Sequence, residues 1–194
     1  MDAHNFLRSR RSVRRFISKP ISDSVIERIL ITTTYAPSAH NLQPWRFVVI
    51  KNPDVKARLA KTLTDKMQID MQAEDAAESE IEKRVANSLR RIDEAPVVIM
   101  LCRDVTDVRV DTPEETIMNI QSTALAGLQL LLAAHAEGLG GNWICWPLYA
   151  SKETQSVLEL PDNWEPQAMI IIGSSTETPA MRERKVLEDV VIRR

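Results

Sequence analysis

The sequence predicts a layered α+β domain with about four or five strands and five or six helices. Three observations carry this prediction. The chain has 194 residues, which suits a single domain over 1–194, and 44% of them are apolar, which is enough for a core. The run from Ala95 to Arg103 is continuously apolar, which is typical of a strand buried on both faces. Residues 112–136 have the pattern of one long helix, and its second half lacks a polar face, as expected in a domain centre or an interface.

The N-terminal part supplies two helices and a strand. Residues 2–9 are expected to form a short helix that leads into a basic loop. Ser22 is a helix start signal, and the apolar residues after it recur at helical spacing until Pro37 ends the pattern. The stretch 45–50, "WRFVVI", is rich in β-forming residues and is expected to be the first strand.

The middle of the chain is expected to be helical. Residues 53–63 fit one helix, and residues 65–93 are charged, free of Gly and Pro and rich in helix formers. This second segment has a weak apolar face, which places it at the surface as a lid over a cleft or as a solvated scaffold. In the long helix that follows, Thr112 is a suitable N-cap, Pro113 fits the first position and Glu115 completes a capping box.

The last third of the chain alternates strands and helices. The stretch 142–148, "NWICWPL", is expected to be a strand or an extended segment, 151–160 a short helix and 168–174 another strand. Residues 182–194 are expected to form a C-terminal arm, and the end of it, "VLEDVVIRR", alternates like a last strand.

Charge and composition exclude several classes of protein. A net charge of -2 gives no global attraction to nucleic acid or to an anionic membrane, so neither is expected as a partner. Cys102 and Cys145 are too few for a disulfide framework and lie in apolar stretches, so buried free thiols are expected. No apolar stretch resembles a signal peptide or is long enough to span a bilayer. We therefore expect a soluble, cytoplasmic protein.

Basic residues gather near both ends of the chain. Residues 8–15, "RSRRSVRR", hold five arginines, and Arg182, Arg184 and Lys185 lie close together near the C-terminus. Like charges at this density repel each other, so an anionic ligand would relieve the repulsion, and the planar guanidinium group matches phosphate. Each cluster by itself could instead be a solvated basic loop. The two clusters together could form a two-sided anion clamp.

Two further stretches could contact a ligand. "APSAHNLQPW", Ala36–Trp45, places hydroxyl, imidazole and amide groups between prolines, and is either a capped turn or a ligand contact. "EGLGGNWICWP" has three glycines in four residues, which let backbone approach a flat or charged group, or end a helix before a strand. The chain has no His/Cys metal cluster, nucleophile elbow, P-loop or GxGxxG, so neither a metal nor a catalytic side chain is expected. This pattern is typical of a protein that holds an organic cofactor, which does the chemistry.

The order of the motifs "RRSVRRF", "APSAHNLQPWRFVV", "AEGLGGNWI" and a terminal basic cluster resembles the FMN-dependent nitroreductase family over nearly the whole chain. The resemblance implies an intertwined α+β homodimer with a mostly antiparallel central sheet and FMN bound at the subunit interface. It also implies hydride transfer from NADH or NADPH through FMN to a nitro compound, quinone or enone. The apolar segment Ala124–Ala136 is the candidate for the dimer core.

The resemblance also places cofactor contacts residue by residue. The first basic block would grip the phosphate, the ribityl chain and the pyrimidine side of FMN, and the terminal arginines would lie near the phosphate. Ser38 and its neighbours would reach the cofactor of the partner subunit, and Lys66 falls where some relatives place an asparagine against the ring. The contacts implied in this way are Arg10, Arg11, Ser12, Arg14, Pro37, Ser38, Asn41, Lys66, Pro147, Leu148, Arg182 and Arg184.

Two features leave other functions open. Pro147 has no N–H where relatives present backbone donors to the flavin, so that contact would pass to Trp146 or Leu148 or be lost. The stretch after Gly138 is also similar to the flavin domain of deazaflavin-coenzyme gamma-glutamyl ligases. A cofactor-binding domain related to deazaflavin biosynthesis, a flavoenzyme with other chemistry and a cofactor-free nucleic-acid binder therefore remain alternatives to the reductase.

Overall fold

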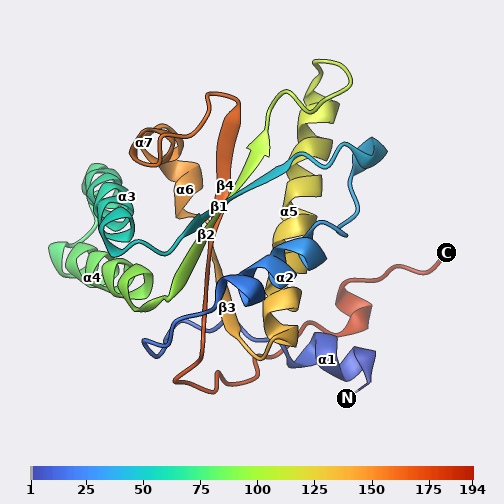
Figure 1. Ribbon diagram of the computed structural model, residues 1–194, viewed down its shortest axis with the longest axis horizontal. Coiled ribbons are helices and arrows are strands. Elements are labelled where there is room, and N and C mark those ends of the chain that lie inside the picture. Colours follow the sequence, from blue (N-terminus) through green and yellow to red (C-terminus); the bar gives the residue numbers. More distant parts are fainter. Residues whose placement is uncertain (1) are drawn as a thin grey trace.

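A four-stranded antiparallel sheet forms the centre of the computed structural model, which describes residues 2–194 (Figure 1). The strands lie in the order β1-β2-β4-β3, so that β1 and β3 are the edges. The predicted α+β class and the antiparallel sheet are confirmed. The strands are β1 (Trp45–Ile50), β2 (Val97–Asp104), β3 (Gly140–Ile144) and β4 (Trp164–Gly173).

Helices cover both faces of this sheet. The helices are α1 (Ala3–Ser9), α2 (Asp23–Thr33), α3 (Pro53–Ala73), α4 (Glu78–Glu94), α5 (Pro113–Ala136), α6 (Trp146–Tyr149) and α7 (Ser151–Val157), and the 3-10 turns are η1 (Ala39–Asn41) and η2 (Leu187–Asp189). Figure 1 shows α2 and α5 on one side of the sheet and α3, α4, α6 and α7 on the other. The sheet is thus the middle layer of three.

The two central strands explain the two cores. All eight residues of β2 are buried, as its continuous apolar run predicts, because both faces of the sheet are covered. Successive side chains of a strand point to opposite faces. Ile99 and Leu101 therefore join the core beneath α2 and α5, whereas Val98 and Met100 join the core beneath α3 and α4.

The helix α5 confirms the prediction of a long central helix. The Thr112 hydroxyl accepts from Glu115 N at 3.3 Å at its start. Within residues 2–194 it is the one helix long and apolar enough to cross a membrane, and half of that apolar window is buried inside the fold. Gly127 packs so closely on the sheet that a methyl group there would overlap Trp143. The outer side keeps an exposed apolar stripe, formed by Ile117, Ile120, Leu125 and Leu128.

The predicted boundary between the two middle helices is wrong. The helix α3 continues through residue 64 to Ala73, and α4 begins only at Glu78. The chain reverses between them through Asp75, which has a φ of 55°. Met71 of α3 and Ile81 of α4 are buried against each other's helix, and this packing holds the two helices as an antiparallel pair.

The prediction for 142–148 is correct only in its first part. β3 ends at Ile144, and the helix α6 starts at Trp146, because Pro147 suits the first turn of a helix. The expected strand over 186–194 is wrong: all of these residues are exposed and only η2 is regular.

The two cysteines differ in their surroundings. Cys102 lies in β2, and burial raises the pKa of its thiol to about 12. The predicted burial of Cys145 is wrong, because the chain leaves the sheet at the end of β3 and exposes this residue. Trp143 Nε1 donates to Cys145 Sγ at 3.1 Å.

Candidate functional site

The two basic clusters from opposite ends of the chain meet in one pocket. It has a volume of about 500 Å³ and lies between the loop after α1 and the segment after β4. Glu177, Pro179 and Ala180 complete its wall. Half of the predicted cofactor contacts line it, namely Arg10, Arg11, Ser12, Arg14, Arg182 and Arg184.

Backbone pairing with the sheet holds the N-terminal loop at this pocket. Val13 N donates to Gly141 O at 3.0 Å, so the loop runs beside the start of β3. Ile17 N donates to Ser174 O at 3.0 Å, just after the end of β4. Val13 and Phe16 are buried, and the basic side chains between them are left at the surface. Backbone hydrogen bonds therefore fix the loop against the sheet, and it is not a free basic tail.

The pocket carries excess positive charge. Burial, and then the nearby charges of Arg11 and Arg184, lower the pKa of Arg10. The one acid in the lining, Glu177, accepts from Arg14 N at 2.7 Å. Five arginines facing one carboxylate favour an anionic ligand with several acceptor oxygens. Sequence reasoning missed Glu177, because a single acid in a C-terminal loop gives no signal.

The glycines beside the pocket have internal roles. Gly138 follows the end of α5 with a φ of 74°, a conformation that favours glycine. A Cβ on Gly140 would lie 2.7 Å from Val13, and one on Gly141 would lie 2.9 Å from Leu131. Helix termination and close packing thus account for the motif. A cavity of about 240 Å³ beside these glycines shares arginines with the basic pocket.

The stretch "APSAHNLQPW" folds as a strained elbow around η1. His40, Asn41 and Gln43 have φ values of 52°, 55° and 52°, a region that residues other than glycine adopt rarely. Pro37 and Asn41 are exposed at the elbow surface. Strain of this kind costs about 1–3 kcal/mol per residue and is concentrated at ligand clamps and other functional sites. The elbow is thus a stronger candidate for a binding element than an ordinary capped turn.

Hydrogen bonds close the elbow and tie it to α5. Ser38 Oγ accepts from Gln43 N at 3.1 Å. Within residues 2–194, the Ser38 hydroxyl donates no hydrogen bond. Ala39 N donates to Ser122 Oγ at 3.0 Å. Ser38 therefore uses its acceptor function to hold the turn, and its hydroxyl hydrogen is not engaged within residues 2–194.

The elbow and the basic pocket lie at opposite ends of α5 (Figure 1). The elbow contacts Ser122, whereas the basic pocket adjoins the glycines that follow Ala136. About 14 residues of helix, or roughly 21 Å, separate these two points. A single chain therefore does not bring Ser38 to the arginines, and the predicted contacts form two separate surfaces.

His40 is held by residues that the sequence did not single out as a group. Its Nδ1 and Nε2 lie 3.1 and 3.2 Å from Arg109 Nη1. His40 Nε2 lies 3.9 Å from the carboxylate of Glu115, which also accepts from Arg109 N at 3.3 Å. The carboxylate expected in a capping box thus supports the elbow instead.

The remaining predicted contacts lie outside the basic pocket. Lys66 on α3 forms an ion pair with Asp70, one turn along the helix. Pro147 is buried, and Leu148 N donates to the carbonyl oxygen three residues earlier at 3.0 Å. Of the two backbone donors considered for this segment, the Leu148 N–H is therefore engaged already, which leaves that of Trp146.

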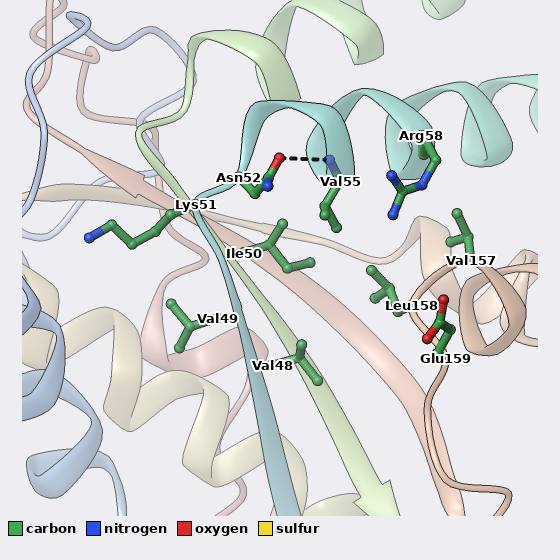
Figure 2. A pocket seen from close by; sticks show the side chains of 10 residues that line it. All are labelled: Val48, Val49, Ile50, Lys51, Asn52, Val55, Arg58, Val157, Leu158 and Glu159. Atoms are coloured by element: carbon green, nitrogen blue, oxygen red, sulfur yellow. Dashed lines mark hydrogen bonds between the residues drawn. The ribbon is translucent and has the colours of Figure 1, made fainter.

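Other parts of the molecule show less specific chemistry. A cavity of about 440 Å³ lies at the edge strand β1. Figure 2 shows apolar side chains from β1, α3 and the end of α7 that turn toward it. None of the predicted cofactor contacts lines it. Within residues 2–194, no group of three or more His, Cys, Asp or Glu side chains is placed to hold a metal ion.

Known proteins resemble this chain over nearly its whole length. YfhC of Bacillus subtilis (strain 168), provisionally named an NAD(P)H nitroreductase, is 29% identical over 188 residues, which cover 95% of this chain and 90% of YfhC. A BluB-like flavoprotein from Clostridium difficile 630 is 27% identical, with a TM-score of 0.84 over 99% of this chain and 98% of that one. A provisionally named nitroreductase from Exiguobacterium sibiricum 255-15, solved with FMN, is 19% identical, with a TM-score of 0.81 over 100% of this chain and 98% of that one.

The family assignment follows from a match over most of the chain. The protein-family model described as "Nitroreductase family" matches residues 7–174 of this chain. This range includes the basic loop, the elbow, the sheet and the glycine segment. This protein therefore belongs to the nitroreductase family.

Proposed function

We propose that this protein is an FMN-dependent oxidoreductase that passes hydride from NADH or NADPH to a small organic acceptor of the nitro, quinone or enone class. The observation that carries the proposal is the basic pocket, in which arginines from both ends of the chain converge. YfhC bears the words NAD(P)H nitroreductase in its name, and the Exiguobacterium sibiricum structure contains FMN, which supports the same reading. We place the protein in the cytoplasm.

The pocket fits the phosphate end of FMN. The charges of Arg11 and Arg184 already disfavour the charged form of Arg10, so a group of about -2 charge would remove a repulsion. Ser12 adds a hydroxyl group between the arginines, and a volume of about 500 Å³ leaves room for a ribityl chain. When bound, FMN would supply the ring that accepts and donates hydride. The residues of this chain bind and orient it, which is where a flavoprotein contributes to the rate.

The purified protein is expected to be yellow, and NADH or NADPH is expected to bleach its flavin absorbance in the absence of oxygen. Absorbance spectroscopy checks this, and a quinone or nitroaromatic compound should then restore the oxidised spectrum. A colourless protein that takes up no FMN would contradict the proposal. A yellow protein that neither nucleotide bleaches would instead support the cofactor-binding-domain alternative.

We further propose a homodimer in which the elbow of one subunit reaches the cofactor of the other. Two observations support it: the elbow and the basic pocket lie at opposite ends of α5, and Ser38 keeps a donor. The exposed apolar stripe of α5 runs beside the elbow and suits the dimer face. This stripe starts at Ile117, so the proposed face extends further toward the start of α5 than Ala124–Ala136.

The C-terminal arm is the second element of the proposed dimer. Val190, Val191 and Ile192 are exposed, and Ile192 keeps 81% of its surface accessible. Within residues 2–194, the outer edge of β1 has no strand partner, and the apolar hollow of Figure 2 lies beside it. An unpaired strand edge and an exposed apolar segment are complementary. We propose that the arm of one subunit lies along β1 of the other.

Deleting residues 186–194 is expected to weaken the dimer strongly, because it removes the apolar end of the arm but keeps Arg182 and Arg184. Sedimentation velocity measures the change as a larger monomer fraction at the same protein concentration. The matched control replaces Arg193 and Arg194 by alanine and should stay dimeric. An unchanged dimer after the deletion would show that the arm does not hold the subunits together.

A further inference from the structure

His135 lies where α1 packs beside the end of α5 (Figure 1). It is half-buried in the last turn of α5 and lines the cavity of about 240 Å³ beside the glycines. Arg10 and Arg11 line both this cavity and the basic pocket, whereas His135 lines only the former. This histidine is therefore an immediate neighbour of the proposed phosphate site, and no sequence motif accounts for it.

Two contacts join His135 to α1. Its ring stacks on Phe6, with the ring centroids 5.0 Å apart and the planes inclined by 29°. Its Nε2 lies 2.8 Å from Ser9 Oγ. Because the Ser9 hydroxyl donates its hydrogen to Phe6 O at 2.8 Å, it accepts from His135, which places the proton of the neutral ring on Nε2. None of the residues of α1 is buried, so these contacts weigh heavily in holding the helix against the fold.

Two arginines of the basic pocket follow directly after these contacts. Arg10 is the C-cap residue of α1. Arg11 Nη1 donates to Arg10 O at 2.8 Å and also to Arg8 O, so its guanidinium group rests on the last turn of α1. A displacement of this turn would therefore move both arginines away from the pocket.

Opposing influences act on the charge of His135. The C-terminal end of a helix favours a positive charge. Burial, and then the charges of Arg10 and Arg11, nevertheless lower the pKa of His135. A phosphate group in the basic pocket carries a charge of about -2 and would offset the two arginines. The pKa of the histidine would then rise, because a nearby anion favours the protonated ring.

Other charged groups near His135 have partners or face solvent. Glu177 accepts from Arg14 N at 2.7 Å, and Glu137 forms an ion pair with Arg28 at 2.7 Å. Two titratable side chains of α1 are exposed, namely His4 and Arg8. The two arginines at the end of α1 are therefore the charges that a ligand in the pocket would offset at this histidine.

We propose that His135 is a positioning residue of the phosphate site, which holds the last turn of α1 in place and gains a proton at Nδ1 when a phosphate group fills the basic pocket. The proton comes from solvent, and Nε2–H keeps its bond to Ser9 in both states. That the phosphate belongs to FMN rests on the proposed function. A ligand that favours the protonated ring binds more tightly where the ring can still take up a proton, so the gain in affinity appears as the pH falls through the histidine range.

The test measures the dissociation constant of FMN by fluorescence quenching at about pH 5.5 and about pH 8, on either side of the ordinary histidine range. His135→Gln keeps a donor for Ser9 but cannot take up the proton. It is expected to bind FMN like the parent protein at the higher pH and at least about 3-fold more weakly at the acidic pH. FMN phosphate also loses charge on acidification, but equally for both proteins, so the ratio of the two constants isolates His135. His4→Gln, the matched control on α1, should follow the parent at both pH values.

His135→Leu removes the donor and the ring together. This variant is expected to bind FMN about 5-fold more weakly than the parent even at the higher pH, because α1 loses both of its contacts with the histidine. The comparison is made with a variant that unfolds at the parent temperature, so that the loss reports the position of the arginines.

Three results would overturn the proposal: the same ratio of constants at both pH values for His135→Gln, a His4→Gln variant that behaves like His135→Gln, and parent affinity in His135→Leu at the higher pH. Failure of the proposed function is a separate outcome, in which the parent binds no FMN, and inorganic phosphate then serves as the probe. If phosphate raises the Tm of the parent more than that of His135→Gln at the acidic pH, the inference is supported without the flavin. If it raises both equally or not at all, the inference is wrong.

Discussion

Replacing Arg10 and Arg184 together by alanine is expected to lower the affinity for FMN by more than about 100-fold, because each charged hydrogen bond contributes about 1.5–3 kcal/mol. The two side chains come from opposite ends of the chain and line the same pocket. Quenching of free FMN fluorescence on titration with the apoprotein measures the dissociation constant.

The same variant provides a second readout that separates binding from folding. In the apoprotein, the pKa of Arg10 is lowered by burial and by Arg11 and Arg184, so its charge opposes folding. Removing the two charges should therefore not lower the Tm of the apoprotein, whereas the rise in Tm on adding FMN should shrink. Arg15, which pairs with Glu94 at 2.9 Å, is the control, and its replacement by alanine should leave FMN affinity unchanged.

Two results would contradict this account of the basic pocket. One is FMN affinity that is unchanged in the double variant, which would place the phosphate elsewhere. The other is a loss in the Arg15→Ala control that is as large per arginine removed, which would show that only the total positive charge matters.

Gly127→Ala is expected to destabilise the fold by about 2 kcal/mol and to lower Tm by roughly 4–8 °C. A methyl group at this position would overlap the ring of Trp143 and lie 2.8 Å from Leu101 Cδ2. Both neighbours belong to the sheet, so neither can move without disturbing the core. The direction of the change in Tm separates close packing from helix propensity, because alanine in a helix interior is otherwise favoured over glycine by about 1 kcal/mol. Differential scanning calorimetry of the FMN-free proteins measures the change.

The matched control for this prediction lies on α3, away from the proposed dimer face. Ala57 is exposed on α3, so Ala57→Gly should cost only the helix propensity of about 1 kcal/mol. If Gly127→Ala instead raised Tm, the close approach of α5 to the sheet would be wrong, and helix propensity would dominate.

Local pattern predicts most of the elements of this fold. The apolar run of β2 and the capped start of α5 both appear in the structure where the sequence places them. The break between α3 and α4 was not predictable in this way. The residues at 74–77 are ordinary helix formers, and the reversal at Asp75 depends on Met71 and Ile81 packing between the two helices. That packing joins residues ten apart only after the chain has turned.

The candidate site, like the fold, could be predicted from the sequence only in part. Each basic cluster can be found in the sequence, but a basic loop alone does not indicate a pocket. Pairing of Val13 with Gly141 and of Ile17 with Ser174 brings the two clusters together. The cavity that Arg91 of α4 and Trp146 line together gives no signal in the sequence, because charged residues on α4 resemble any solvated helix face. Only the fold places these two residues in one cavity.

The sequence by itself determined the order of the helices and strands, the apolar faces that form the core and the positive charge of the binding residues. These are local properties, set by the spacing and chemistry of neighbouring side chains. Only the tertiary structure decided which distant residues meet: Arg10 with Arg184, and Arg91 with Trp146. It also placed the elbow at Ser122 of α5, about 14 residues or roughly 21 Å of helix from the end of α5 that adjoins the basic pocket. The physical reason is that distances between remote segments depend on strand pairing and on the length of α5, and neither is encoded at the residues of the site.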